Sequence, residues 1–510
     1  MAQRRRVEPT SFLMRHARLV PVMSATPTVL PHPPVGVPID VLVIDGRVVE
    51  VGERLPRPPG ANEHDADGRW LIPGLWDQHV HLGQWTEVSQ RLDLTGTRSV
   101  EDALALVKAR IASGPEGPIV GWGHRSAAWL RQPTVADLDA VTEDRPVVLI
   151  CGDGHNAWLN SRALEWLGLP AREGVVQEGE WFRAYARLGA LTGNEGTSPS
   201  AYLRTLRDAA AKGIAGLVDL EFDQSLSAWP EREAVGVELL RIKVGAYIDT
   251  LSEFVAAGLT TGDPLPGCGP LVTMGSLKII SDGSLNTRSA WCCEPYADGG
   301  SGAANLPAGN LRGLMIHAHE HGLEAAIHAI GDAAVHEALN AFEATGANGT
   351  IEHAQLIRRE DSRRMAALGV RASVQPAHLL DDRELTEIVW PDRTHRCFAL
   401  RWLLDDGVDV VLGSDAPVSP LDPWANMAAA VHRGTAEHES WHPEHTLTVH
   451  EALAASTNGL GTVAPGHPAD LALLDADPLP GGSSYEQAQA LRAMTVAATW
   501  VNGRQAHYAL

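Results

Sequence analysis

The chain has 510 residues, of which 44% are hydrophobic, so it is long enough to bury a large core and to form more than one domain. Its formal net charge of −22 argues against nucleic acid as a partner, because an acidic surface repels phosphate backbones. No stretch of about 18 apolar residues runs without a charge, so we expect no membrane partner.

The N-terminal segment and the cysteines favour a cytoplasmic protein. Arg4, Arg5 and Arg6 resemble the start of an export signal, but Glu8 and Arg15 interrupt the apolar run that such a signal needs. The chain contains five cysteines, too few for a disulfide framework at this length, and we interpret them as reduced thiols.

Both ends of the chain contain short strand-like runs separated by turns. These runs are His16–Val20, Val41–Ile44, Arg47–Val51, Ala469–Leu474 and Met494–Val501. Short all-β segments at opposite ends of a chain can pair with each other. We therefore predict a small β-sandwich domain built from residues 1–72 and 464–510.

The central segment, 73–463, alternates between strands and helices. It has eight apolar runs that end in polar or glycine-rich residues: Leu71–Trp76, Ile214–Leu220, Lys243–Ile248, Ser276–Ile280, Leu323–Ile327, Gly349–Ile351, Val370–Val374 and Val408–Leu412. Helix-like stretches such as Tyr202–Lys212 and Ala333–Ala344 lie between most of them. This pattern predicts the α/β class and a (β/α)₈ TIM barrel.

One connection in the predicted barrel, 84–200, is too long to be a single loop. It has its own helices and strands, namely Val100–Ala112, Ile119–Trp122, Pro146–Ile150 and Ser161–Leu167. We interpret this segment as an insertion between the first two barrel strands that caps the barrel mouth.

A His-x-His pair follows the first predicted barrel strand. Alternate residues of a strand face the same side, so His79 and His81 can point into the barrel together and chelate one metal ion. In a chain with 22 histidines, such a pair can also be a structural pair without a metal.

Four more residues of metal-ligand or catalytic type lie at other predicted strand ends: Lys278, His328, His353 and Asp415. Catalytic groups of TIM barrels lie at the carboxyl ends of the strands, which is where these residues fall. Lys278 lies within an apolar strand, where an ammonium group is costly to bury. It could pair with Asp282, which would leave a site for a single metal ion.

The motifs around these residues resemble those of the amidohydrolase superfamily, in the branch called amidohydrolase family 3. This branch includes N-substituted formamide deformylases and homologues of an exoenzyme regulatory protein. The segments that carry the resemblance are Pro73–His81, Leu277–Ala290, His328–Asp332, Ile351–Gln355, Ser373–His378 and Gly413–Val418. Together they extend the resemblance over essentially the whole chain.

The resemblance implies a binuclear metal centre with two divalent ions, for which zinc is the expected metal. His79 and His81 would bind the more buried ion, and His328 and His353 the second one. Lys278 would react with carbon dioxide and bridge both ions as a carbamate. Asp415 would be both a metal ligand and the catalytic residue that handles the proton.

Candidate substrate contacts are His155, Arg288, His378 and Trp122. His155 could equally be a loop histidine with local hydrogen bonds, and Arg288 could pair with an acidic residue instead. The chain has 15 tryptophans, and several lie near the motifs or in the insertion. Such a cluster suits an apolar or aromatic small-molecule substrate, although core packing explains any single tryptophan equally well.

These features predict a hydrolase that cleaves a carbon–nitrogen bond other than a peptide bond, in an amide or an N-acyl or N-formyl amine, with a metal-bridged hydroxide as nucleophile. A deaminase of a ring amidine and an ester hydrolase are the enzymatic alternatives. A regulatory pseudo-hydrolase is the alternative without activity, but such proteins usually lose metal ligands, and here all are present. A homodimer is a further hypothesis, about the assembly of the chain.

Overall fold

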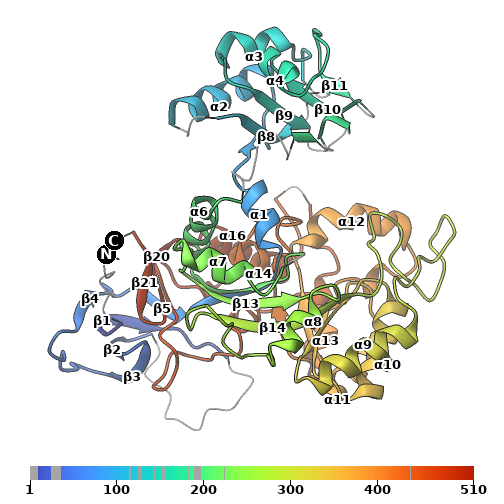
Figure 1. The fold of residues 1–510 in the computed structure, drawn as a ribbon. Helices are drawn as coiled ribbons and strands as arrows, with labels where there is room; N and C mark the ends of the chain where they lie inside the picture. Colours follow the sequence, from blue (N-terminus) through green and yellow to red (C-terminus); the bar gives the residue numbers. More distant parts are fainter. Residues whose placement is uncertain are drawn as a thin grey trace. The chain divides into compact units, whose positions relative to one another are not determined.

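The computed structural model describes residues 10–23, 36–113, 117–124, 126, 129–142, 144–151, 156–177, 180–181, 183–185, 187–188, 197–222, 224–436 and 438–509. The chain divides into two compact units (Figure 1). The larger unit contains Met1–Trp85 and Leu203–Leu510, and the smaller unit contains Thr86–Tyr202.

The two ends of the chain form one sheet in the larger unit. Its strands are β1 (Phe12–Leu19), β2 (Pro38–Ile44), β3 (Arg47–Gly52), β4 (Asn62–Asp65), β5 (Trp70–Pro73), β19 (Leu471–Leu474), β20 (Val496–Val501) and β21 (Arg504–Tyr508). They pair in the order β21-β20-β19-β5-β1-β2-β3, with β4 beside β1. The rings of Phe12 in β1 and Trp500 in β20 stack with centroids 5.5 Å apart. In a flat sheet, strands three steps apart would be separated by about 14 Å, so this sheet folds over a shared core.

The second sheet of the larger unit is an eight-stranded parallel barrel. Its strands are β6 (Leu75–Val80), β12 (Ile214–Asp219), β13 (Arg241–Ala246), β14 (Val272–Ile280), β15 (Ala325–Ala329), β16 (Gly349–His353), β17 (Arg371–Val374) and β18 (Val410–Leu412). Hydrogen bonds from Asp415 N to His79 O (2.7 Å) and from His81 N to Ala416 O (2.9 Å) join the ends of β18 and β6. The TIM-barrel prediction is therefore confirmed, together with an additional sheet from the chain ends.

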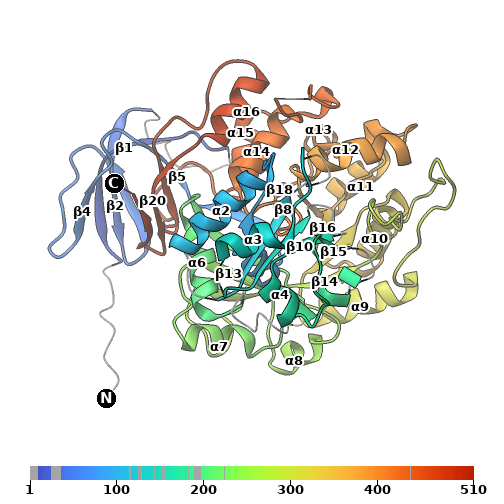
Figure 2. The same ribbon diagram turned by 90° about the horizontal axis from the view of Figure 1, so that it is seen from above.

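Helices surround the barrel strands (Figure 2). The helices of the larger unit and of its junction are α1 (Leu82–Val88), α6 (Pro199–Ala210), α7 (Ala228–Ala234), α8 (Leu251–Ala256), α9 (Ala308–Glu320), α10 (Asp332–Thr345), α11 (Arg359–Leu368), α12 (His378–Val389), α13 (Leu400–Asp405), α14 (Pro423–His432), α15 (Val449–Ala455) and α16 (Ser484–Arg492). Helix α10 shows why they pack there: Val335, Leu339 and Phe342 form a buried stripe at helical spacing. Gly346, with φ of 66°, then ends this helix.

The structure differs from the predicted first barrel strand, Leu71–Trp76. The chain breaks at Gly74, so that Leu71 and Ile72 belong to β5 of the end sheet and the barrel strand β6 begins at Leu75. A Cβ atom at Gly74 would lie 2.4 Å from the Cβ of Ala215, so only glycine permits the chain to pass so close to β12. Apolar residues continue across the break because both sheets bury this segment.

The smaller unit has a five-stranded sheet and its own core. Its elements are β7 (Leu92–Asp93), α2 (Val100–Ser113), β8 (Ile119–His124), α3 (Val135–Thr142), β9 (Val147–Cys151), β10 (Asn156–Leu159), α4 (Ser161–Trp166) and β11 (Val176–Gln177). The strand order is β11-β10-β9-β8-β7, and side chains such as Leu149, Ile150 and Trp158 are fully buried in this unit. That this unit caps the barrel remains a prediction.

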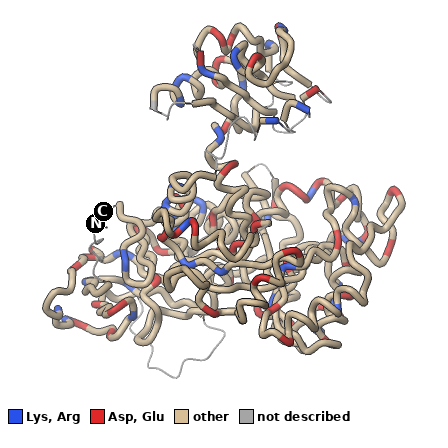
Figure 3. Tube along the Cα trace, viewed as in Figure 1, with Lys and Arg blue, Asp and Glu red and all other residues tan. Residues whose placement is uncertain are grey.

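Two further observations concern the distribution of charged residues and the character of the helices. Acidic and basic residues are scattered along the chain in both units (Figure 3). Over the described part of the chain, no helix combines the length and the apolar character that crossing a bilayer requires.

Candidate metal centre

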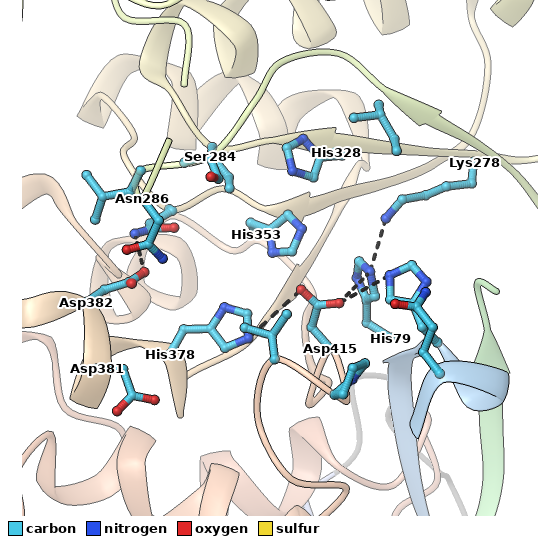
Figure 4. Close-up of a pocket in the computed structure, with 18 of the residues that line it drawn as sticks. His79, Lys278, Ser284, Asn286, His328, His353, His378, Asp381, Asp382 and Asp415 are labelled. Carbon is cyan, nitrogen blue, oxygen red and sulfur yellow. Dashed lines mark hydrogen bonds and ion pairs between the residues drawn. The ribbon is translucent and has the colours of Figure 1, made fainter. Parts of the chain in front are cut away.

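A cavity of about 540 Å³ lies at the carboxyl ends of the barrel strands. All six residues that the sequence predicts as metal ligands line it: His79, His81, Lys278, His328, His353 and Asp415 (Figure 4). They come from β6, β14, β15, β16 and the segment after β18, far apart in the chain. The parallel barrel brings them together because it gathers the carboxyl ends of all its strands at one face.

The spacing of three of these side chains fits a divalent metal ion. Asp415 Oδ1 lies 3.5 Å from His79 Nε2 and 3.3 Å from His81 Nε2. Ligand atoms bound at about 2.1 Å around a tetrahedral zinc ion are about 3.4 Å from one another. Imidazole nitrogens and a carboxylate oxygen are also the donors that zinc prefers, so the donor set and its spacing both fit such an ion.

A buried carboxylate determines which nitrogen of His79 faces the cavity. His79 Nδ1 lies 2.8 Å from Glu352 Oε2, and both side chains are almost completely buried. Because a carboxylate only accepts, Nδ1 carries the proton and Nε2 keeps its lone pair for a metal. Burial lowers the pKa of His79 to about 4, with a further contribution from the charge of Lys278, so the imidazole is neutral at neutral pH.

Asp282 lies beside His328, but without the hydrogen bond that joins Glu352 to His79. His328 Nδ1 lies 3.1 Å from Asp282 Oδ1, and the Asp282 carboxylate accepts hydrogen bonds from the backbone amides of Ile330, Gly331 and Trp291 at 2.9–3.1 Å. The hydrogen bonds of the Asp282 carboxylate thus come from backbone amides, and its Oδ1 also lies close to the His328 ring. This arrangement disfavours the alternative in which Asp282 forms an ion pair with Lys278.

Lys278 lies in β14 with only 2% of its surface exposed. Its Nζ is 3.2 Å from His79 Nε2, at the ligand side of that imidazole. Burial lowers the pKa of Lys278, which increases the fraction of neutral amine. A neutral amine is the form that attacks carbon dioxide, so the position and the chemistry of Lys278 both fit a carbamate.

Two of the candidate ligands have backbone conformations that L-residues rarely adopt. His353 has φ of 72° and Asp415 has φ of 53°. Glu352 and His353 are neighbours, so in a continuous strand their side chains would face opposite sides. The left-handed turn at His353 lets its ring line the cavity while Glu352 contacts His79 behind it. Such strain, which costs about 1–3 kcal/mol per residue, is typical of functional sites.

His378, predicted as a substrate contact, lines the cavity at the start of α12. Its Nε2 lies 3.9 Å from Asp415 Oδ2, and donor atoms of His353, His378 and Asp415 fall within 4.8 Å of one another. Burial would raise the pKa of Asp415, but the charge of His79 and the hydrogen bond with His81 hold it well below its usual value. Asp415 is therefore an anion flanked by three imidazoles.

The structure describes two of the other three predicted substrate contacts. Arg288 is about half exposed, forms an ion pair with Asp298 and does not line the cavity. Trp122 belongs to β8 of the smaller unit, where the guanidinium of Arg91 lies 5.7 Å from its ring. His155 lies outside the described residues.

Sequence reasoning missed the carboxylates that hold the ligands. Glu352 and Asp282 were not assigned to the histidines, and Asp77 was not singled out. The Asp77 carboxylate accepts hydrogen bonds from the backbone amides of His79 (3.1 Å) and Ser414 (2.9 Å). Burial raises the pKa of Asp77 to about 7 despite these hydrogen bonds. The available signal was an acidic residue within two positions of a histidine at a strand end.

Comparison with known proteins agrees with the fold and the cavity. The Amidohydrolase family model matches residues 62–507. Since this match spans most of the chain, the protein belongs to that family, and the resemblance found in the sequence is confirmed. It is a hydrolase by family, and its metal dependence is supported by the solved structures that it is similar to.

Several relatives cover nearly the whole chain. The putative amidohydrolase YtcJ of Bacillus subtilis is 28% identical over 91% of this chain and 95% of its own. The N-substituted formamide deformylase of Arthrobacter pascens is 25% identical over 91% of this chain and 94% of its own. A metal-dependent hydrolase from Pyrococcus horikoshii has a TM-score of 0.69 at 25% identity, over 92% of this chain and 98% of its own.

Proposed function

We propose that the protein hydrolyses a carbon–nitrogen bond in an amide or an N-acyl or N-formyl amine, using a binuclear centre of divalent ions, with zinc as the expected metal. The observation that carries this proposal is the convergence of four histidines, Lys278 and Asp415 in one cavity at the barrel mouth. Two ions need more protein ligands than a single ion does. They also need a group that bridges the two sets of ligands. Lys278, as a carbamate, would be that bridge.

The residues divide into ligands and a proton carrier. His79 and His81 would hold one ion, His328 and His353 the other, with Asp415 beside the first. Ions bound there would polarise the scissile carbonyl and make a water molecule more acidic. Asp415 would accept the proton of the attacking water and return it to the leaving amine. In the overall reaction, the C–N bond breaks and a C–O bond forms. Water supplies the hydroxyl of the carboxylic acid product and the proton of the amine product.

Three features support C–N hydrolysis. The N-substituted formamide deformylase relative acts, by its name, on such a bond. An amine is a poor leaving group unless it is protonated, and the Asp415 carboxylate lies in the cavity near His378 to carry that proton. Lys278 favours a binuclear site over the mononuclear site expected for a ring-amidine deaminase.

The test is a substrate panel with enzyme reconstituted with zinc and bicarbonate. The panel contains N-formyl amines, N-acetyl amines, ring amides, ring amidines and carboxylic esters of matched size. We expect the open-chain amides to be hydrolysed with the highest kcat/KM. Asp415→Asn should reduce kcat by roughly 10²–10⁴-fold while most of the metal stays bound.

Metal analysis accompanies the panel. The wild-type protein should bind nearer two ions than one, and Lys278→Ala should lose the second ion and most activity, with partial rescue by short carboxylic acids. A wild-type stoichiometry that stays at one ion contradicts the binuclear centre. Faster turnover of esters or ring amidines than of every amide contradicts the proposed reaction.

A further inference from the structure

Two apolar side chains are exposed within the cavity of the candidate metal centre. Phe222 follows β12 and Val418 follows β18, both in the larger unit, and 43% and 63% of their surfaces are exposed. Of the large apolar side chains that are exposed in the described part of the chain, only these two line this cavity. Single exposed apolar side chains are common on protein surfaces, but apolar surface in a cavity beside polar groups is typical of a binding site.

The ring of Phe222 is held in place by two other rings. It stacks on the imidazole of His81, with ring centroids 4.9 Å apart and an angle of 16° between the planes. The ring of Tyr247 packs against it with centroids 5.1 Å apart, and the Tyr247 hydroxyl donates to the carbonyl of Leu220 at 2.7 Å. Because these contacts fix the orientation of Phe222, its exposed part is a fixed apolar surface of the cavity.

The backbone at both apolar side chains is also fixed. Glu221 accepts hydrogen bonds from the backbone amides of Phe222 (2.9 Å) and of Gln84 (2.8 Å), which lies in α1. The Gln84 side chain donates to the same carboxylate at 3.1 Å. The backbone amide of Val418 donates to the carbonyl of Asp415, a proposed metal ligand, at 2.8 Å. Both side chains therefore have defined positions before any ligand binds, which reduces the entropic cost of binding.

Phe222 and Val418 lie on either side of the strand that leads to the first pair of proposed ligands. In the barrel, β6, which carries His79, pairs with β12 on one side and is joined to the end of β18 on the other. Phe222 and Val418 follow these two neighbours, so they flank the carboxyl end of β6. Figure 4 shows Asp381 and Asp382 at the other end of the cavity from His79. The apolar surface thus belongs to the part of the cavity near the metal ligands.

We propose that Phe222 and Val418 form a subsite for an apolar substituent of the substrate, a hydrocarbon ring or a branched chain, next to the scissile bond. Because Phe222 contacts the proposed ligand His81 directly, this substituent is attached within a few bonds of the amide. The inference rests on the proposed amide hydrolysis and narrows its substrate class. The preferred substrate is an N-acyl amine with a hydrocarbon group beside the amide.

The first experiment compares substrates of equal shape and different polarity on the zinc- and bicarbonate-reconstituted enzyme. N-(cyclohexylmethyl)acetamide is paired with N-(tetrahydropyran-4-ylmethyl)acetamide, in which an ether oxygen replaces one methylene group. The N-methylamides of cyclohexylacetic acid and tetrahydropyran-4-ylacetic acid form the corresponding pair on the acyl side. In one of the two pairs, kcat/KM should be at least about tenfold higher for the cyclohexyl compound, because an ether oxygen against Phe222 and Val418 loses its hydrogen bonds with water. Ratios near one in both pairs contradict the subsite.

Variants assign this preference to the two side chains. Val418→Thr keeps the shape of the side chain and adds a hydroxyl, and Phe222→Ala removes the ring. The ratio of kcat/KM values should fall by at least about threefold in Val418→Thr and further in Phe222→Ala. The matched control is Ile388→Thr in α12, at a side chain that is 64% exposed and does not line the cavity. The control should keep the wild-type ratio.

Phe222 also contacts a proposed metal ligand, so its variants need a second measurement. Competition with a chromogenic chelator measures the zinc affinity of Phe222→Ala and Phe222→Leu. Leucine restores an apolar side chain without the stacked ring, so Phe222→Leu should regain most of the preference for the cyclohexyl compound. If Phe222→Ala binds zinc more weakly but keeps the wild-type ratio, then Phe222 only positions His81 and the subsite is overturned.

A binding experiment separates this inference from the proposed reaction. Hydroxamic acids bind zinc, and calorimetry of their binding needs no turnover. Cyclohexylacetohydroxamic acid is compared with tetrahydropyran-4-ylacetohydroxamic acid, and N-(cyclohexylmethyl)-N-hydroxyformamide with its tetrahydropyran analogue. In one pair the cyclohexyl compound should bind at least about tenfold more tightly, and Val418→Thr but not Ile388→Thr should reduce this difference. That result supports the subsite even if no amide is hydrolysed.

Equal binding within both pairs overturns the subsite. If Phe222→Ala and Val418→Thr then also lower the melting temperature more than Ile388→Thr does, another part of the chain covers the two side chains. A tenfold difference that remains unchanged in both variants overturns the assignment as well, because the apolar group must then bind elsewhere.

Discussion

At the scale of single residues, the candidate centre depends on carboxylates that stand behind the ligands. Glu352 accepts a hydrogen bond from His79 Nδ1, and the Thr350 hydroxyl donates to the same carboxylate. Burial would raise the pKa of Glu352, but the hydrogen bond from His79, with the charges of His79 and Lys278, lowers it to about 2. Glu352 is therefore a positioning residue: it orients the His79 ring and makes Nε2 a better electron-pair donor to a metal ion.

Replacing this carboxylate tests the positioning role. Glu352→Gln keeps an acceptor for Nδ1 but removes the charge, so the affinity for the first metal ion should fall by about 10–100-fold. Competition with a chromogenic chelator measures this affinity. The activity of the variant should recover when zinc is raised in proportion to the lost affinity.

A carboxylate–histidine pair away from the cavity, with a buried carboxylate and a half-exposed imidazole, provides the control. Asp361 is fully buried and lies 3.0 Å from His336 Nδ1, between α10 and α11. Asp361→Asn should lower the melting temperature without changing metal affinity. If Glu352→Gln does the same, then Glu352 is structural only.

At the scale of elements, one helix near the barrel is fixed by a charged cap. Thr448 and Glu451 form a capping box at the start of α15, and Glu451 also binds Arg401 of α13 through two contacts at 2.6 and 2.9 Å. The hydrogen bond from Arg401 lowers the pKa of Glu451 to about 2. The depressed pKa means that this stabilisation is fully present above the usual glutamate pKa and is lost as pH falls from about 4.5 toward 2.

Glu451→Gln should therefore destabilise the larger unit by about 1–2 kcal/mol near neutral pH, since glutamine preserves the capping box but loses the ion pair. Thermal unfolding of wild type and variant at several pH values measures the difference. It should be constant above pH of about 4.5 and shrink below that value.

Another capping box, at the start of α16, is a matched control for this helix. Ser483 and Glu486 cap α16 with the same geometry, and Glu486 lacks an arginine partner among the described side chains. Glu486→Gln should change the melting temperature less than Glu451→Gln. Equal effects would mean that the capping box, and not Arg401, accounts for the stabilisation.

At the scale of the whole molecule, the chain is divided into units with unequal roles. All six proposed ligands belong to the larger unit, and the smaller unit has its own buried core. A metal that binds only the folded larger unit stabilises that unit alone, by about 4 kcal/mol when its free concentration is a thousand times its dissociation constant.

Scanning calorimetry can detect this asymmetry. Removing metal with a chelator should lower the transition of the larger unit by several degrees, and the transition of the smaller unit should not move. Zinc with bicarbonate should restore the first transition further than zinc in buffer free of carbon dioxide, because Lys278 needs carbon dioxide to bridge. A chelator that shifts both transitions equally would show that the units unfold as one.

The sequence by itself determined the barrel and the six candidate ligands. Apolar runs predict strands because a buried strand must be apolar, and a polar residue at the end of such a run stands out. His79, Lys278 and Asp415 were found in this way, and the cavity contains all of them. The break at Gly74 was missed because residues on both sides of it are buried, in two different sheets.

Only the tertiary structure decided which groups meet. Glu352 and His79 are 273 positions apart, and no local pattern shows that barrel closure places them 2.8 Å from each other. The same holds for Gln355 and Asp382, whose contact depends on how α12 packs over the barrel. Periodicity in a sequence reports which side of an element is buried. The partner of a buried polar group depends on the register of distant strands, which the three-dimensional fold alone establishes.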